Sequence, residues 1–272
     1  MKKKCIKILI LCLVLIFIYA PILILAVYSF TDTATIGTTG NFSLQNYITL
    51  FTTPELMDMI GGTISLAVLS AFIATILGTV GAIGIFYSKK NTQLSANMMN
   101  QIPVVNADVV TGFSVCILLV VVFGINKETY FPLIAGHVTL SAPFVYLAVL
   151  PKLKQMDSSL YEAALDLGAT PFYALRKVII PQIISGIVSG FALAVTLSLD
   201  DYFIATYTKP ATFDTISTYV VNATKGSQTE IKTALWALST IIFVIVLLIA
   251  VSMNFVSTDR SDNRKAGQTG EN

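Results

Sequence analysis

Six apolar stretches, each long enough to cross a membrane, divide this sequence. They fall near residues 8–30, 61–87, 103–125, 130–150, 184–208 and 233–256. A helix needs about 20 residues to cross a hydrocarbon core of about 30 Å, and a single spanning segment in lipid must be helical to pair its backbone groups. Since 55% of the residues are hydrophobic and 12% are charged, the composition excludes a soluble globular domain. We expect an all-α integral membrane protein with six transmembrane helices.

The Lys and Arg residues predict the orientation of these helices. If both termini lie in the cytoplasm, only four of the 17 Lys and Arg residues lie outside, namely Lys127, Lys209, Lys225 and Lys232. The other 13 then lie inside, as the positive-inside rule requires. The net charge of +2 therefore signals orientation, and no nucleic-acid-binding surface is implied.

Neither processing nor cross-linking is predicted. The first apolar stretch runs from Ile8 to Phe30 without a small-residue cleavage site, so it is expected to remain as a signal anchor. The three cysteines, Cys5, Cys12 and Cys116, have neither the spacing of a metal site nor that of a disulfide framework. We expect all three cysteines to be unpaired thiols.

The chain is predicted to form one domain. No linker rich in Pro, Gly or Ser interrupts residues 1–256, which we interpret as a single transmembrane domain. Within it, the outer loop over residues 31–60 is expected to carry a short helix around residues 44–51. The polar composition of residues 257–272 predicts a cytoplasmic tail without fixed structure.

A charged loop between the fourth and fifth stretches carries strong helix signals. Ser159 and Glu162 have the spacing of a capping box, so a short helix should begin there. Gly168 supplies a left-handed residue to end that helix. Pro171 starts a second helix, since proline at the first helical position loses no hydrogen bond, and Pro181 disturbs the pattern ten residues later. The loop is therefore predicted to be a helix-turn-helix.

The same loop resembles the coupling loop of binding-protein-dependent ABC importer permeases. That family has a Glu-Ala-Ala triplet, a Gly four residues later and an apolar-x-apolar-Pro ending. The matching residues here, with one acidic residue between them, are Glu162, Ala163, Ala164, Asp166, Gly168 and Pro181. Val178 and Ile180 stand where the family usually has Ile and Leu, and they keep the size and polarity. The resemblance implies the type I ABC importer permease fold, with residues 157–183 docking on the ATPase.

Three carboxylates lie inside the predicted spans, where each costs about 2.5–3.5 kcal/mol at a helix centre. Asp108 is near the start of the third stretch, and Asp200 and Asp201 are near the end of the fifth. At 100° per residue, Asp200 extends a polar stripe made of Ser185, Ser189, Thr196 and Tyr207. Asp201 extends a stripe of small residues made of Gly190, Ala194, Ser198 and Ala205. One carboxylate can line a hydrated path while the other holds a neighbouring helix; alternatively, the pair only marks the membrane exit.

The acidic run Leu197–Phe203, together with the coupling loop over Glu162–Gly168 and with Asp108 shortly after a Pro, makes the whole chain similar to the second permease subunit of spermidine/putrescine ABC importers. The resemblance implies that Asp108, Ser198, Asp200 and Asp201 lie on the path of the polyamine. Tyr202, Phe203 and Tyr207 can add cation–π attraction, or they form an aromatic belt at the membrane interface. The family's Trp in the first outer loop is absent, and Asn46-Tyr47 lies in its neighbourhood.

The resemblance also implies an assembly. It comprises a homologous permease subunit as heterodimer partner, two ATPase subunits and an extracytoplasmic solute-binding protein, in the cell membrane of a prokaryote. This chain is expected to bind no cofactor, because it has no G-x-x-x-x-G-K-[ST] loop, so ATP and Mg²⁺ belong to the partner ATPase.

Two alternatives stay open at this point. The same machinery can carry another small solute, such as an amino-phosphonate, thiamine or ferric ion. The other alternative is a membrane-embedded enzyme. The chain has one histidine, His137, and neither H-E-x-x-H nor G-x-S-x-G, so we expect this histidine to be a hydrogen-bonded structural residue.

Overall fold

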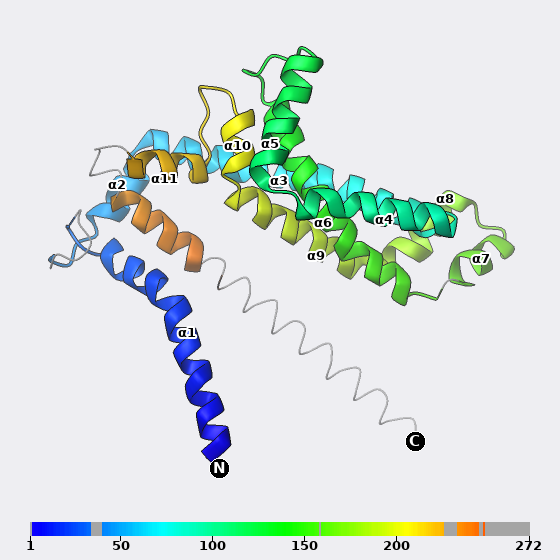
Figure 1. Cartoon of the computed structure of the whole chain (residues 1–272), viewed down its shortest axis with the longest axis horizontal. Coiled ribbons are helices and arrows are strands. Elements are labelled where there is room, and N and C mark those ends of the chain that lie inside the picture. The colour runs from blue at the N-terminus through cyan, green and yellow to red at the C-terminus, as the bar shows by residue number, and fades with distance from the viewer. Residues whose placement is uncertain (1, 34–39, 158, 226–232, 245–246, 248–272) are drawn as a thin grey trace. The chain divides into compact units, whose positions relative to one another are not determined.

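A computed structural model describes residues 2–33, 40–157, 159–225, 233–244 and 247 of the chain. Helices dominate these residues, which confirms the all-α prediction (Figure 1). In chain order the elements are α1 (Lys2–Ser29), α2 (Gln45–Thr52), α3 (Pro54–Phe86), α4 (Lys90–Val105), α5 (Asp108–Cys116), the π-helix η1 (Ile117–Val122), α6 (Phe131–Gln155), α7 (Ser159–Asp166), α8 (Pro171–Ala174), the π-helix η2 (Leu175–Ile179), α9 (Ile180–Asp200), α10 (Phe203–Thr208) and α11 (Ile216–Lys225). A further apolar helix covers Thr233–Val244.

Four helical segments of the described residues are long and apolar enough to cross a membrane. They are Ile10–Ser29, Pro54–Phe86, Phe131–Gln155 and Pro171–Asp200. They correspond to the first, second, fourth and fifth predicted spans. Of the sixth predicted span, residues 233–256, residues 233–244 and 247 are described, and the remainder lies outside the described residues, as does the polar tail over residues 257–272.

The third span differs from the prediction. The chain forms α4 and then α5 with η1, and these two parts are bent by 101°. Between them Asn106 and Ala107 are extended, with ψ angles of 146° and 135°. The Asn106 side chain donates to the hydroxyl of Thr111 at 3.0 Å across the break. Asp108 therefore begins a helix, and does not lie inside one continuous span over residues 103–125.

The chain divides into two compact units, residues 1–57 with 222–272, and residues 58–221. In the first unit, α2 is the short outer-loop helix that the sequence predicted. The side chain of Asn46 is buried and donates to the carbonyls of Ser29 and Thr31, at 3.0 Å each. These bonds tie α2 to the end of α1.

In the second unit, α6 lies along α9 (Figure 1). The fully buried Val145 of α6 packs between Gly78 of α3 and Gly190 of α9. A Cβ added at Gly78 would lie 2.7 Å from Val145 Cβ, and one added at Gly190 would lie 3.1 Å from Val145 Cγ1. Gly190, Ala194 and Ser198 are buried on α9, so the stripe of small residues is at a helix contact as predicted.

Candidate functional site

The charged loop folds as two short helices, α7 and α8, separated by a turn at Gly168. The Gly168 N–H donates to the carbonyl of Leu165 at 2.9 Å, and the Ala169 N–H donates to the carbonyl of Ala164 at 3.1 Å. This pair of bonds is a Schellman motif, which needs a left-handed residue at its centre. Gly168 has φ +85°, and nothing lies within 4 Å of the place where its Cβ would be.

The start of α7 differs from the prediction. Ser159 is not the capping acceptor; instead Asp157 accepts hydrogen bonds from the Ser159 N–H at 3.0 Å and from its hydroxyl at 2.8 Å. These bonds hold the pKa of the Asp157 carboxyl below its usual value, because they favour the charged form. A carboxylate two residues earlier replaces the predicted capping box.

The second helix of the loop leads directly into α9. The hydroxyl of Thr170 accepts from the Tyr173 N–H at 3.4 Å, and Pro171 is the first residue of α8. Helical structure then continues through η2, and Pro181 is the second residue of α9. The predicted disturbance takes the form of a π-helical segment just before Pro181, since proline cannot donate to the carbonyl four residues earlier.

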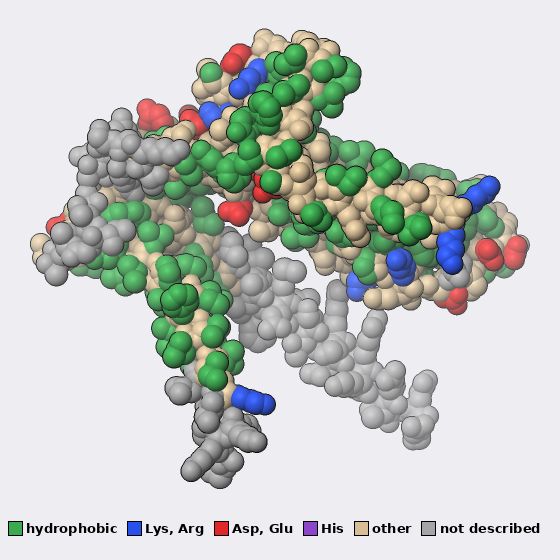
Figure 2. Space-filling model, viewed as in Figure 1, with side chains coloured by type: hydrophobic (Ala, Val, Ile, Leu, Met, Phe, Trp, Pro, Cys, Tyr) green, Lys and Arg blue, Asp and Glu red, His purple; other side chains and the backbone are tan. Residues whose placement is uncertain are grey.

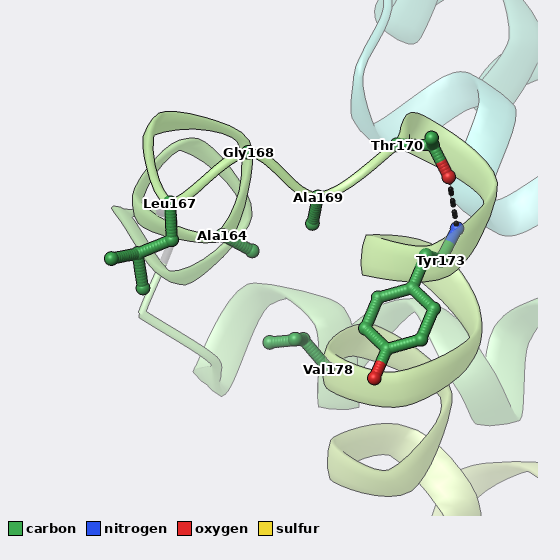
Figure 3. A pocket seen from close by; sticks show the side chains of 7 residues that line it. All are labelled: Ala164, Leu167, Gly168, Ala169, Thr170, Tyr173 and Val178. Carbon is green, nitrogen blue, oxygen red and sulfur yellow. Dashed lines mark hydrogen bonds between the residues drawn. The ribbon is translucent and has the colours of Figure 1, made fainter.

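The two helices border a shallow hollow of about 540 Å³ (Figure 3). It is lined by Ala164, Leu167, Gly168, Ala169, Thr170, Tyr173 and Val178. Large apolar side chains here are open to solvent, with Leu167 89% exposed and Phe172 73% exposed. The two short helices therefore carry large apolar side chains that the described part of the chain leaves uncovered.

Charged residues surround this end of the second unit, as Figure 2 shows. α6 ends with Lys152 and Lys154, and η2 carries Arg176 and Lys177. Glu162 and Asp166 of the predicted docking residues are exposed, as are Ala163 and Pro181, whereas Ala164 is half-buried. The ring of Tyr161 lies 4.9 Å from that of Tyr87, which holds α7 against the end of α3.

The second candidate site lies at the break between α9 and α10. α9 ends at Asp200, and Asp201 is extended with ψ 124°. Its side chain is buried, and both carboxylate oxygens accept backbone bonds from the start of α10. Oδ1 accepts from the Ile204 N–H at 3.1 Å, and Oδ2 accepts from the Ala205 N–H at 2.7 Å. Asp201 therefore caps α10 in the manner of an N-cap carboxylate.

A chain of buried polar side chains extends from this break. The hydroxyl of Ser198 lies 2.9 Å from Nδ1 of His137 on α6 and 3.2 Å from the hydroxyl of Ser70 on α3. On its other side, Nε2 of His137 lies 3.7 Å from Oδ2 of Asp201. The prediction that His137 is a hydrogen-bonded structural residue agrees with this place, because its side chain is fully buried.

The other two predicted carboxylates are exposed. Asp200 continues the stripe of Ser185, Ser189 and Thr196, all of which are exposed on α9. Asp108 is the exposed first residue of α5. Ser198, Asp200 and Asp201 thus lie at one break, with Asp200 exposed and the other two buried, whereas Asp108 begins α5, whose Gly112 packs on Ile204 of α10.

Sequence reasoning missed two features of these sites. It did not connect His137 with Asp201, which are 64 positions apart on different helices, although Asp201 has the Asp-x-x spacing of a helix cap. It also took Ser159 rather than Asp157 as the cap of α7. Among the described residues, no group of three or more His, Cys, Asp or Glu side chains is arranged to hold a metal ion.

Membrane-length helices, an exposed two-helix loop and carboxylates at a helix break define a membrane transport permease. The chain belongs to the family described as "Binding-protein-dependent transport system inner membrane component", whose model matches residues 100–260. It is therefore a transport subunit of the inner membrane and not an enzyme.

Two relatives and one solved structure agree with this family. The spermidine/putrescine transport system permease protein PotC of Escherichia coli K12 is 27% identical over 256 residues, covering 94% of this chain and 93% of the relative. The putrescine transport system permease protein PotI of the same strain is 32% identical over 245 residues, covering 87% of this chain and 85% of the relative. A bacterial alginate ABC transporter, solved in complex with an alginate pentasaccharide-bound periplasmic protein, contains a chain of the same fold, with TM-score 0.68, 18% identity and 92% of each chain covered.

Proposed function

We propose that this chain is one permease subunit of a polyamine importer and forms half of the translocation path. The observation that carries the proposal is the pair of exposed carboxylates, Asp108 at the start of α5 and Asp200 at the end of α9, because α5 packs on α10, the helix that follows α9. Polyamines carry several ammonium groups separated by short methylene chains, so their path needs spaced acceptors that attract without holding. The names of the two relatives, which include spermidine and putrescine, support the same substrate class.

The four path residues have different parts in this proposal. Asp108 and Asp200 face the path and attract the ammonium groups, whereas Ser198 and Asp201 form its buried wall. The exposed hydroxyls of Ser185, Ser189 and Thr196 line the same side of α9. Two of these hydroxyls, those of Ser189 and Thr196, already donate to carbonyls of their own helix, so they offer acceptor oxygens to a cation.

The exposed loop is the proposed contact with an ATPase. Leu167 and Phe172 present apolar surface next to the hollow, and Glu162 and Asp166 add charge around it. An eight-residue helix such as α7 is too short to be stable alone in water, so a partner groove holds it. The docking set comprises Glu162, Ala163, Ala164, Asp166, Gly168 and Pro181.

The proposed importer contains several subunits besides this chain. A homologous permease supplies the other half of the path, two ATPase subunits hold the two coupling loops, and a solute-binding protein delivers the polyamine. ATP and Mg²⁺ bind to the ATPase subunits, and both termini of this chain lie in the cytoplasm. Closure of the ATPase dimer on ATP moves the loops and opens the path outward, and hydrolysis resets it.

Uptake by the complete importer in proteoliposomes tests this function. The vesicles contain this chain, its partner permease, the ATPase and the binding protein, with ATP on the ATPase side. Labelled putrescine and spermidine should accumulate, and unlabelled polyamines should compete. Competition by thiamine, an amino-phosphonate or ferric ion without competition by polyamines would assign the chain to another solute.

A further inference from the structure

We infer that Asp201 and His137 are positioning residues, which hold Asp108 and Asp200 in place and do not bind the substrate themselves. This inference rests on the proposed function, because the placement of Asp108 and Asp200 matters only if a cation passes them. It distinguishes two adjacent carboxylates that have the same chemistry but different surroundings.

The carboxylate of Asp201 is already occupied by the protein. Both of its oxygens accept backbone N–H groups, at 3.1 and 2.7 Å, and its side chain is only 3% exposed. A buried carboxylate that caps a helix has neither the access nor the free lone pairs that a passing ammonium group needs. Asp200, one residue earlier, is the exposed last residue of α9.

The helix that Asp201 caps links α5 to α6. Ile204, in the first turn of α10, is fully buried between two glycines. A Cβ added at Gly112 of α5 would lie 2.9 Å from Ile204 Cα, and one added at Gly136 of α6 would lie 2.6 Å from Ile204 Cγ2. Gly112 is one helical turn after Asp108. The position of α10 therefore sets where Asp108 stands relative to the end of α9.

His137 completes this framework from α6. It lies one residue after Gly136, with Nδ1 2.9 Å from the Ser198 hydroxyl and Nε2 3.7 Å from Asp201 Oδ2. The imidazole is fully buried, so no solute reaches it. Ser198, two residues before Asp200, is hydrogen-bonded to His137, and Asp201, one residue after it, is held by its two backbone bonds, so the side chain of Asp200 is directed to the exposed face.

Matched substitutions separate positioning from substrate binding. Asp201→Asn keeps a capping oxygen and removes the charge, whereas Asp201→Ala removes both. We expect the complete importer with Asp201→Asn to keep at least about half of its polyamine uptake. Asp201→Ala should lower the maximal rate about tenfold or more, leave KM within about twofold, and lower the Tm of the purified complex. His137→Leu should also lower the maximal rate and the Tm, whereas His137→Gln, which keeps a polar side chain, should retain most of both.

The contrasting variant is Asp200→Asn, for which we expect a raised KM and an unchanged Tm. If Asp201→Asn raises KM as much as Asp200→Asn does, with the Tm of the wild type, Asp201 is a substrate ligand and the inference is wrong. If Asp200→Asn leaves polyamine uptake unchanged while Asp201→Ala still lowers the Tm, the polyamine path fails but the structural role of Asp201 stands.

If the importer with Asp201→Ala does not assemble, the distance between positions 108 and 200 gives a second test of the positioning role. Spin labels at Asp108→Cys and Asp200→Cys, with Cys5, Cys12 and Cys116 replaced by Ser, report the separation of the two positions in the complete importer. His137→Leu should broaden the distribution of distances, and His137→Gln should leave it narrow. An unchanged distribution in His137→Leu would overturn the positioning role.

Discussion

Two helix breaks in this chain lie beside the two proposed functional surfaces, and they are built in opposite ways. At Gly168 the break is made by backbone bonds alone, the glycine is exposed, and large apolar side chains next to it face solvent. At Asp201 the break is made by a buried side chain that caps the next helix and contacts a buried histidine. In the proposed importer another protein completes the first break, whereas the second is completed within the chain.

The largest effect is expected from Gly168→Val. A β-branched residue at φ +85° costs about 1–3 kcal/mol and redirects α8, although nothing blocks its Cβ. The loop then no longer fits its groove, and transport should be abolished while the chain still inserts in the membrane. Uptake and ATP hydrolysis by the complete importer measure this result.

Gly124→Val is the matched control for the same strain. Gly124 also has a positive φ, of +67°, and also has open space around its Cβ position, but it lies in the loop before α6. We expect this variant to transport at close to the normal rate. Normal uptake with an unchanged ATPase rate in Gly168→Val would show that the loop does not couple.

A smaller effect on transport is expected when the exposed apolar side chains of the loop become polar, with a loss of about tenfold or more in the affinity for the ATPase. Leu167→Ser and Phe172→Ser each remove apolar area that a partner would bury, worth about 1.5–3 kcal/mol for a full side chain. The affinity of the ATPase for the permease should fall accordingly, which co-purification at graded salt measures.

Cross-linking locates the same contact. Leu167→Cys in a chain without its native cysteines should cross-link to the ATPase, whereas Thr129→Cys, exposed in the loop before α6, should not. Failure of every cysteine between residues 160 and 168 to cross-link, in a complex that still co-purifies, would count against the docking surface.

A smaller effect again, about fivefold to tenfold, is expected from removing one path charge. Asp108→Asn and Asp200→Asn each remove about 1 kcal/mol or more of attraction for an ammonium group near a protein surface. Uptake at limiting polyamine should fall by this factor, and the loss should shrink at high substrate concentration. Asp58→Asn, which changes an exposed carboxylate on α3, is the matched control. Full uptake by both path variants would refute the carboxylate path.

The smallest effect, less than about twofold in transport, is expected from Asp157→Ala. The Asp157 carboxyl has a lowered pKa in the folded protein, so its stabilisation of α7 is present above the ordinary carboxyl pKa and is lost as the pH falls through the folded value. At neutral pH, amide exchange in the first turn of α7 should therefore be faster in the Ala variant than in the wild type. Equal exchange in both proteins would show that this cap does not hold the helix.

The sequence predicted those features of the fold that depend on residues close together in the chain. The apolar stretches predicted most of the membrane-length helices, and the glycine at position 168 predicted the left-handed helix end. The stripe of Gly190, Ala194 and Ser198 predicted a close helix contact, because helical spacing alone places small residues on one face.

Features that depend on distant partners were not predictable in this way. The 101° bend before Asp108 lies at two extended residues, Asn106 and Ala107, whereas the proline of this stretch, Pro103, lies inside α4 and does not mark the bend. The contact between His137 and Asp201 joins α6 to the end of α9, and helical periodicity within one span carries no information on such a contact. For the same reason, the sequence did not show which of Asp200 and Asp201 is exposed.

The central claim is that the break at Gly168 serves coupling to the ATPase and the break at Asp200 and Asp201 serves substrate attraction. The most direct test is to measure polyamine uptake and ATP consumption together in the same vesicles, for Gly168→Val and Asp200→Asn. We predict that Gly168→Val loses transport-coupled ATP consumption at every polyamine concentration. Asp200→Asn should keep the maximal rate and the ATP consumed per polyamine, and should only need more substrate to reach half of that rate. The same defect in both variants, whether in maximal rate or in half-saturating concentration, would contradict the assignment of coupling to one break and substrate attraction to the other.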